Sequence, residues 1–158
     1  MPKIILCRGI PGSGKTFWSK QWVLEDPEHR VRFNNDDIRN MLGKYWIPSR
    51  EKLVLNLKKL FIMSSMMAGY DIVIDNMNLN PKEVEFYKTH IEEHNQIMEE
   101  LNEETKLNFQ DDFKYELEFK DFFIPLKDCI ERDSKRPNPI GEDVIKKTYE
   151  KYKDILEG

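Results

Sequence analysis

The sequence predicts an α/β fold, in which a central parallel sheet of about four strands is flanked by helices and carries a helical lid. Short apolar segments of strand length alternate with longer segments whose apolar residues recur at helical spacing. A glycine-rich turn joins the first apolar segment to the first helix. The length of 158 residues is that of one compact domain. Residues 1–158 are therefore predicted to form a single domain with one active site.

The first half of the chain alternates predicted strands with helices. Residues 3–8 form an apolar segment typical of a buried strand, and the pattern becomes helical after Gly14. A short strand at 31–33 alternates apolar and basic residues. Asparagine and aspartate residues at 35–37 then favour the start of a brief helix, which runs through Leu42.

A longer helix and a third strand follow. Residues 49–68 repeat apolar positions at helical spacing, and Gly69 ends that helix before the apolar strand 71–75. Since a helix separates each strand from the next, the strands are expected to run parallel.

The second half contains one more strand and three helices. Residues 81–107 predict a charged helix, and 114–122 alternate in strand fashion. Pro125 opens a helix that runs to about Arg136, and Gly141 separates it from a final helix.

Charge is distributed unevenly along the chain. Residues 91–121 hold eleven Asp or Glu against three Lys or Arg, a local charge of −8 within a total of −4. The rest of the chain therefore carries +4. The interval 99–112 is either a solvated helix face or a mobile insertion.

The composition excludes several classes of protein. Apolar residues make up 39% and charged residues 34% of the chain, which is typical of a water-soluble globular domain. No stretch approaches the roughly 20 apolar residues of a membrane span, so we expect a cytoplasmic protein with no membrane partner. Cys7 and Cys129 belong to no CxxC or Cys/His cluster, so we expect both to be reduced and buried rather than bound to zinc or in a disulfide.

Residues 9–16 fit the pattern GxxxxGK[ST], between an apolar strand and an amphipathic helix. Glycines in this pattern let backbone N–H groups converge on phosphates, at the positive end of a helix. Lys15 would reach the β and γ phosphates, and Thr16 would offer its hydroxyl to Mg²⁺. The motif predicts a P-loop NTPase fold that takes ATP, or another NTP, with Mg²⁺. The predicted nucleotide-binding residues are Gly9, Ile10, Pro11, Gly12, Ser13, Gly14, Lys15 and Thr16.

A second polar cluster follows the strand at 31–33. If residues 36–39 are helical, Asp36 and Arg39 lie on one face. A carboxylate near the γ-phosphate can accept the proton of an attacking hydroxyl, and an arginine beside it can fork onto a phosphate of the acceptor. In the alternative, Asp36 or Asp37 caps the helix and Arg39 is a surface charge.

Two further clusters follow. Three asparagines after the strand at 71–75, among them Asn76 and Asn78, favour either a ligand crevice or a hydrogen-bonded turn. Asp75 would either hydrogen-bond to a ligand of the metal or accept a hydrogen bond within the turn. Arg132 and Arg136 lie one turn apart before a proline- and glycine-rich break, which predicts a hinged basic lid over the phosphates. The alternative is a solvated helix end.

These four segments, in this order, resemble the 5′-kinase domain of phage polynucleotide kinase. The resemblance runs from Lys3 to about Tyr152, and its motifs are Gly9–Thr16, Asn34–Arg39, Asn76–Pro81 and Arg132–Arg136. It implies ATP-dependent phosphoryl transfer to the 5′-hydroxyl end of DNA or RNA, in nucleic-acid repair. It also implies the cytoplasm of the host cell as the location if the chain is phage-encoded.

The resemblance implies a role for each matching residue. Lys15 and Arg136 would act on the donor phosphates, with Arg132 beside them, and Asp36 would be the general base toward the 5′-hydroxyl. Arg39 would bind the phosphate on the 3′ side of the first nucleoside. Asn76 and Asn78 would complete the acceptor site.

The chain also departs from the family. Phe17 stands where a second hydroxyl often follows the P-loop, and Asn35 replaces a basic residue. Asn76 aligns with an acidic position that braces the acceptor-binding arginine, a role that Asp75 could take. The phosphatase signature DxDGT is absent from the sequence, so no phosphatase domain is expected.

Two other function classes share the P-loop. A P-loop kinase of a nucleotide or another small molecule would need the same cradle and arginine lid. A nucleotide-dependent switch would need a base-reading motif, and no NKxD occurs in the sequence. No feature of the sequence indicates an oligomeric state or a choice between RNA and DNA.

Overall fold

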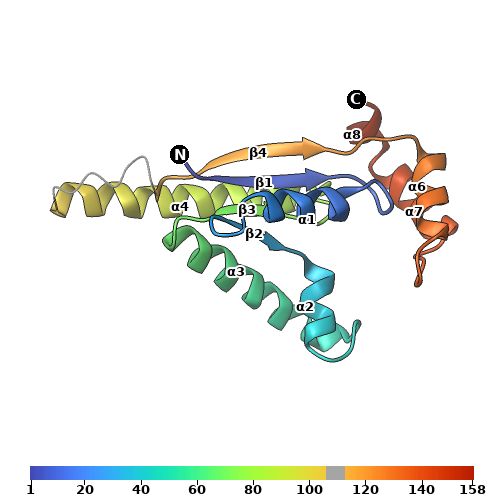
Figure 1. Ribbon diagram of the computed structural model, residues 1–158, viewed down its shortest axis with the longest axis horizontal. Coiled ribbons are helices and arrows are strands. Elements are labelled where there is room, and N and C mark those ends of the chain that lie inside the picture. The colour runs from blue at the N-terminus through green and yellow to red at the C-terminus, as the bar shows by residue number, and fades with distance from the viewer. Residues whose placement is uncertain (106–112) are drawn as a thin grey trace.

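A computed structural model describes residues 1–105 and 113–158 (Figure 1). Its four strands form one sheet in the order β2-β3-β1-β4, and every neighbouring pair is parallel. The predicted α/β class and four-stranded parallel sheet are thus confirmed. The strands are β1 (Lys3–Arg8), β2 (Arg30–Phe33), β3 (Asp71–Ile74) and β4 (Glu116–Asp121).

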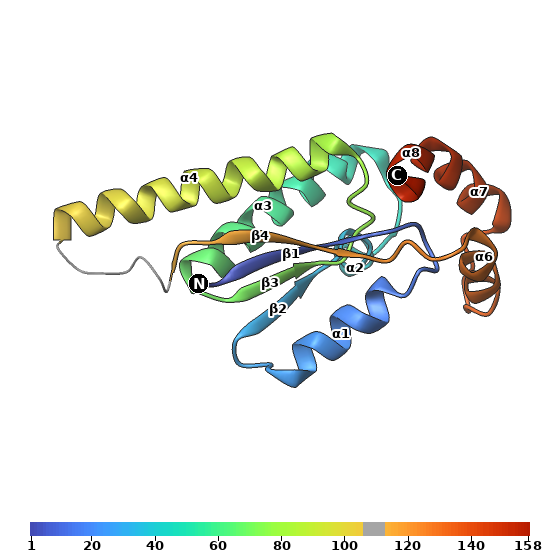
Figure 2. The same ribbon diagram turned by 90° about the horizontal axis from the view of Figure 1, so that it is seen from above.

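Helices cover both faces of the sheet. Helix α1 lies against one face, and α3 and α4 lie against the other (Figure 2). The helical elements are α1 (Lys15–Glu25), α2 (Asn35–Met41), the 3₁₀ turn η1 (Pro48–Arg50), α3 (Glu51–Met67), α4 (Pro81–Thr105), α6 (Leu126–Ser134), α7 (Glu142–Lys151) and α8 (Lys153–Glu157). They follow the predicted ranges with three differences: the segment predicted at 49–68 opens with a 3₁₀ turn, the helix predicted to reach about Arg136 ends at Ser134, and the single final helix predicted after Gly141 is divided into α7 and α8.

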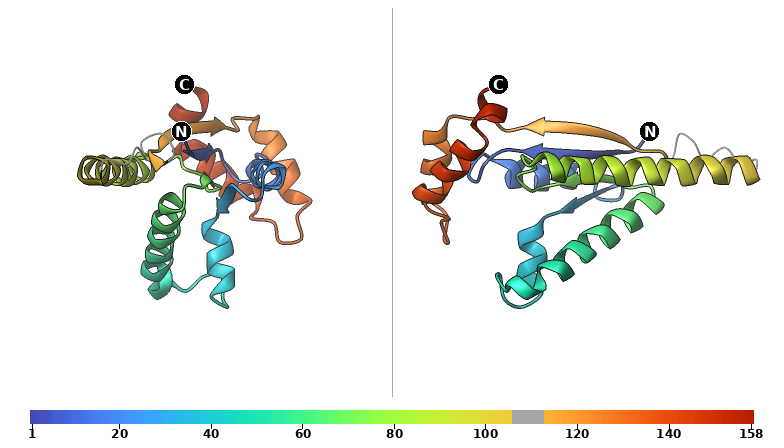
Figure 3. Two further views of the ribbon diagram at one scale, coloured as in Figure 1. Left: turned by 60° about the vertical axis from the view of Figure 1, so that its left-hand side comes forward. Right: turned by 180° about the vertical axis from the view of Figure 1, so that it is seen from behind.

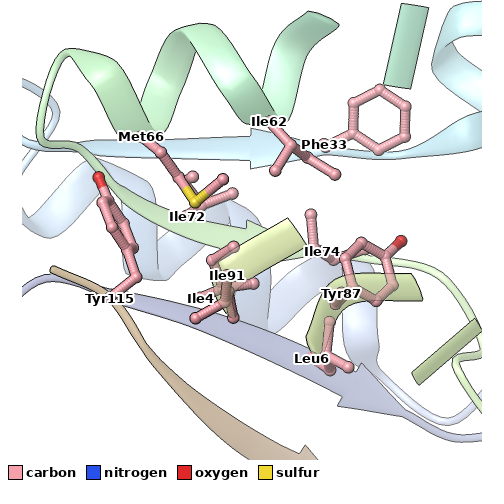
Figure 4. Close-up of a cluster of buried hydrophobic side chains, with 10 residues drawn as sticks. All are labelled: Ile4, Leu6, Phe33, Ile62, Met66, Ile72, Ile74, Tyr87, Ile91 and Tyr115. Atoms are coloured by element: carbon pink, nitrogen blue, oxygen red, sulfur yellow. The ribbon is translucent and has the colours of Figure 1, made fainter. Parts of the chain in front are cut away.

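The core is built from both faces of the central strands. Successive residues of a strand point to opposite faces, so Ile4 and Leu6 pack toward α3 and α4 while Ile5 and Cys7 pack toward α1. Figure 4 shows the larger cluster, in which Ile62 and Met66 of α3 meet the side chains of β1 and β3. Burial on both faces explains why residues 4–7 of β1 are all apolar rather than alternating.

The strand ends define one functional edge. The arrowheads of the strands point toward the end of the molecule where α2, α6 and α7 lie (Figures 1 and 3). Ligands of open parallel sheets bind outside the carboxyl ends of the strands. All the predicted site residues belong to loops and helices that follow those ends.

Three other predictions concern the cysteines, membrane-spanning helices and the acidic interval. Both cysteines are free and buried, as expected. No helix among the described residues is long and apolar enough to cross a membrane. Within the predicted acidic interval 99–112, residues 99–105 form the end of α4, and residues 106–112 lie outside the described residues.

Candidate active site

The glycines of the P-loop are required by backbone conformation and by close packing. Gly12 and Gly14 have positive φ values of 82° and 100°, which residues with a Cβ rarely adopt. A Cβ on Gly12 would lie 2.3 Å from the carbonyl oxygen of Cys129 in α6. The Gly9 N–H donates to the Met77 carbonyl (3.1 Å), which ties the loop to the segment after β3. The loop is therefore held from both sides.

Lys15 lies inside the loop that it would serve. Its Nζ donates to the Ile10 carbonyl (2.8 Å) and to Ser13 Oγ (3.3 Å), and the residue is only 9% exposed. Burial lowers the pKa of Lys15 to about 8; the carboxylate of Asp75 opposes that shift, and the charge of Arg136 adds to it. The ammonium is therefore poorly solvated. Its two hydrogen-bond acceptors are neutral, so an anion would bind it more strongly than they do. Thr16, next in the chain, is exposed.

Helix α2 presents the predicted carboxylate on its first turn. Asn34 is the N-cap, since its side-chain oxygen accepts from the Asp37 N–H at 2.9 Å. The alternative in which Asp36 or Asp37 caps the helix is wrong. Asp36 Oδ1 instead accepts from Arg39 Nη1 (2.7 Å) and from the Tyr45 hydroxyl (3.0 Å). Its side chain is 52% exposed, and its Oδ2 has no hydrogen bond among the described residues.

Arg39 is held by a residue that the local pattern does not indicate. Its Nε and Nη2 donate to the two carboxylate oxygens of Glu51, at 3.1 and 2.6 Å. Together with the bond to Asp36, these use three of the five N–H donors of the guanidinium. The other two form no further hydrogen bond to a carboxylate in the described part of the chain, and the Tyr45 hydroxyl lies beside the guanidinium. Arg39 is thus fixed in place with capacity left for an anion.

The residue suggested as a brace for Arg39 has a different partner. Asp75 is 1% exposed, and its Oδ2 accepts from Nε and Nη2 of Arg32 at 2.9 and 2.6 Å. Arg32 also contacts Asp37, and the Asn34 side chain donates to the Asp75 carbonyl. This network joins β3 to the start of α2. The sequence feature that could have indicated the role of Arg32 is its position as a charged residue between two apolar residues of a strand.

The asparagines after β3 serve the backbone. Asn78 is 1% exposed, has a φ of +50°, and its amide nitrogen donates to the carbonyls of Cys7 (2.7 Å) and Ile74 (3.0 Å). Its amide nitrogen is thus used in holding the turn, while its side-chain oxygen is buried without a hydrogen-bond partner among the described residues, and its substrate-binding role stays a prediction. The Asn76 side-chain oxygen accepts from the Asn35 N–H at 3.0 Å, so Asn76 positions the first turn of α2.

Helix α6 brings Arg132 to the P-loop edge, and Arg136 lies two residues past the end of this helix. Arg132 Nη1 donates to the Ser13 carbonyl at 3.4 Å. The Arg136 side chain is 52% exposed and lies 3.6 Å from the carboxylate of Asp133. That carboxylate is buried and also accepts from the backbone N–H groups of Ile140 and Gly141, at 3.1 and 3.0 Å.

Acidic side chains therefore steady this helix end. Asp133 holds the segment 135–141, and Lys135 pairs with Glu131. Cys129 further anchors α6, because it is buried beside Ile10 of the P-loop. Any lid movement must be limited to the segment after α6.

Comparisons with known proteins agree with this architecture. The family model described as an AAA domain matches residues 4–158. A chain of the Pnkp1/Rnl/Hen1 RNA repair complex superposes with a TM-score of 0.71 at 19% identity, over 99% of this chain and 45% of that one. A second Pnkp1/Rnl/Hen1 structure gives a TM-score of 0.58 at 19% identity, over 83% and 38% of the two chains.

A sequence relative covers only part of the chain. Midasin of Dictyostelium discoideum is 31% identical over 83 residues, which are 51% of this chain and 1% of midasin. The chain thus spans less than half of the solved chains it matches and a small part of midasin, and the structural likeness shows the fold. Since the family match covers nearly the whole chain, the protein belongs to the AAA domain family.

Proposed function

We propose that this protein is an ATP-dependent kinase that phosphorylates the 5′-hydroxyl end of a polynucleotide, DNA or RNA. The observation that carries the proposal is the Asp36–Arg39 pair, which is joined at 2.7 Å on α2, at the same sheet edge as the P-loop. It offers a proton acceptor and a phosphate-binding group side by side. The motif resemblance and the likeness to a chain of an RNA repair complex support the same assignment.

On the acceptor side, each group has a separate task. Arg39 and Tyr45 hold one oxygen of Asp36, which leaves Oδ2 to accept the proton of the attacking hydroxyl. The two remaining donors of Arg39 can bind the phosphate on the 3′ side of the first nucleoside. Glu51 keeps the guanidinium in position for that contact. Asn76 contributes by fixing the start of α2.

On the donor side, the P-loop supplies backbone N–H groups and Lys15, and Arg132 and Arg136 approach from α6. Thr16 is exposed at the start of α1, so its hydroxyl fits the role of a Mg²⁺ ligand. Mg²⁺, when bound, would neutralise charge on the donor phosphates. Lys15 and Arg136 would neutralise the negative charge on the donor phosphates that the metal does not neutralise.

Nucleotide binding is expected to take up protons at mildly alkaline pH. Below a pKa of about 8 Lys15 is already charged, whereas above it the nucleotide-free protein holds the neutral amine. Donor phosphates raise that pKa, because they favour the charged form. Calorimetry in buffers of different ionisation enthalpy should give uptake of roughly half a proton at pH 8 and almost none at pH 6.5.

The control is Lys15→Arg, whose guanidinium stays charged throughout this range. Nucleotide binding by this variant should release or take up almost no protons at either pH. ATP affinity of the unmodified protein should also weaken as pH rises above 8. Equal proton uptake at pH 6.5 and 8 would contradict the assignment of Lys15 as the titrating phosphate ligand.

The acceptor should require a 3′ phosphate. Because Arg39 binds that group, a 3′-nucleotide should be a minimal acceptor and a bare nucleoside a poor one, by roughly 10- to 150-fold in efficiency. Arg39→Ala should erase the difference. Transfer from labelled ATP to a 5′-hydroxyl oligonucleotide, a 3′-nucleotide and a nucleoside measures it.

The same panel tests the proposed function as a whole. Transfer confined to a nucleoside without a 3′ phosphate would favour a small-molecule kinase. ATP binding with no transfer to any hydroxyl would favour a nucleotide-dependent switch. Either result would exclude a polynucleotide kinase.

A further inference from the structure

Two exposed aromatic rings lie beside the proposed acceptor site. Tyr45 and Trp46 belong to the turn between α2 and η1 and are 50% and 54% exposed. The guanidinium carbon of Arg39 lies 5.9 Å from the ring centroid of Tyr45 and 5.7 Å from that of Trp46. Half-exposed aromatic surface next to a charged pair is costly to hydrate unless a ligand covers it.

The turn that carries these rings is held in place. Arg50 donates to the Leu42 carbonyl across the base of the turn, and the Tyr45 hydroxyl donates to Asp36. Glu51, the residue after Arg50, accepts hydrogen bonds from Arg39. The Tyr45 ring is therefore positioned by the same contacts as the proposed general base, and Trp46 follows it in the held turn, 5.7 Å from the phosphate-binding arginine, so a ligand would meet a largely preformed surface.

The type of ligand follows from the neighbours. A 5′-terminal nucleotide with its hydroxyl at Asp36 and its 3′ phosphate at Arg39 has one large group left, its base. Nucleobases are flat, and they stack on aromatic side chains in proteins that bind single strands without sequence preference. Tyr45 adjoins both residues and the Trp46 ring adjoins Arg39, so the base of that nucleotide is the group within reach of the rings.

We propose that Trp46, with Tyr45, forms a stacking subsite for the base of the 5′-terminal nucleotide of the acceptor. This subsite rests on the proposed function and adds to it a preference for unpaired ends, since the base must leave its duplex neighbours to stack on protein. It would accept all four bases, because every base has a π face.

The test compares two 5′-hydroxyl oligonucleotides that share a 3′ phosphate and differ only in whether the terminal nucleotide carries a base. Stacking on one aromatic residue is worth roughly a 5- to 150-fold change. The unmodified protein should use the abasic end less efficiently by a factor in that range. Trp46→Ala should fall to a similar level with the normal end and lose little more with the abasic one.

Two variants serve as controls. Trp46→Phe keeps a ring and should retain most of the preference for the normal end. Leu60→Ala removes exposed apolar surface from α3, where Leu60 is 60% exposed, and should behave as the unmodified protein does. A binding readout without the donor is the quenching of tryptophan fluorescence by a 5′-hydroxyl oligonucleotide, which should be weaker in Trp46→Phe.

The outcomes separate the two proposals. If the unmodified protein phosphorylates normal and abasic ends equally, the stacking subsite is wrong and the kinase assignment stands. If it phosphorylates neither end, the kinase assignment itself fails. An equal loss by Trp46→Ala on both ends, with unchanged quenching in Trp46→Phe, would make Trp46 a structural residue of the turn and overturn the subsite.

Discussion

Asp36→Asn is expected to reduce phosphoryl transfer to a 5′-hydroxyl end by roughly 10²- to 10⁴-fold, the range for loss of a general base. Asparagine has the same shape, and its oxygen can still accept from Arg39 and Tyr45. It cannot accept the proton of the hydroxyl. The variant should therefore keep its fold and its ATP affinity while losing the chemical step.

Lys15→Ala separates the two sides of the site. It removes the cation that the P-loop encloses, so both ATP affinity and transfer should fall. Nucleotide titration together with single-turnover transfer distinguishes the two variants. A matched control is Tyr45→Phe, which removes one hydrogen bond to Asp36 and keeps the carboxylate. Near-normal turnover by Asp36→Asn would leave Asp36 a structural partner of Arg39.

The features that were predicted correctly from the sequence are local. The P-loop needs a fixed order of glycines, lysine and threonine over eight positions, and the parallel sheet follows from strands separated by helices. The pairing of Asp36 with Arg39 follows from helical spacing alone. The P-loop and the Asp36–Arg39 pair depend on residues that are close in sequence, and the parallel direction of the strands depends only on the helix that separates each strand from the next.

The features that were missed depend on tertiary contacts. Glu51 is 12 residues from Arg39, and Asp75 is 43 residues from Arg32, so no periodic pattern relates either pair. Which of them braces Arg39 depends on how α3 packs beside α2. The positive φ of Asn78 likewise arises from the turn that it occupies, and that turn decides whether its amide faces a ligand or the backbone.

Arg136→Ala is expected to lower kcat for 5′-end phosphorylation by a factor on the order of 10² or more, with a much smaller rise in the KM for ATP. The Arg136 side chain is 52% exposed and its charge lowers the pKa of Lys15, so it lies near the proposed donor site without being buried in it. Such a group gains most when charge develops on the transferred phosphoryl group. Lys135→Ala is the matched control, because Lys135 is the neighbouring cation, is 74% exposed and pairs with Glu131.

The position of Arg136 before nucleotide binds depends on Asp133, which pairs with it and accepts from two N–H groups of the following loop. Donor phosphates would compete with this carboxylate for the guanidinium, because they carry more negative charge. Arg136 can then move toward the donor while Asp133 keeps its bonds to Ile140 and Gly141. Hydrogen exchange across 130–142 should therefore slow when an ATP analogue binds, chiefly at Asn138 in the loop after α6, because the N–H groups of Arg136, Ile140 and Gly141 are already hydrogen-bonded. Unchanged exchange together with a defect only in KM would mean that Arg136 is a static ATP contact and that no lid closes.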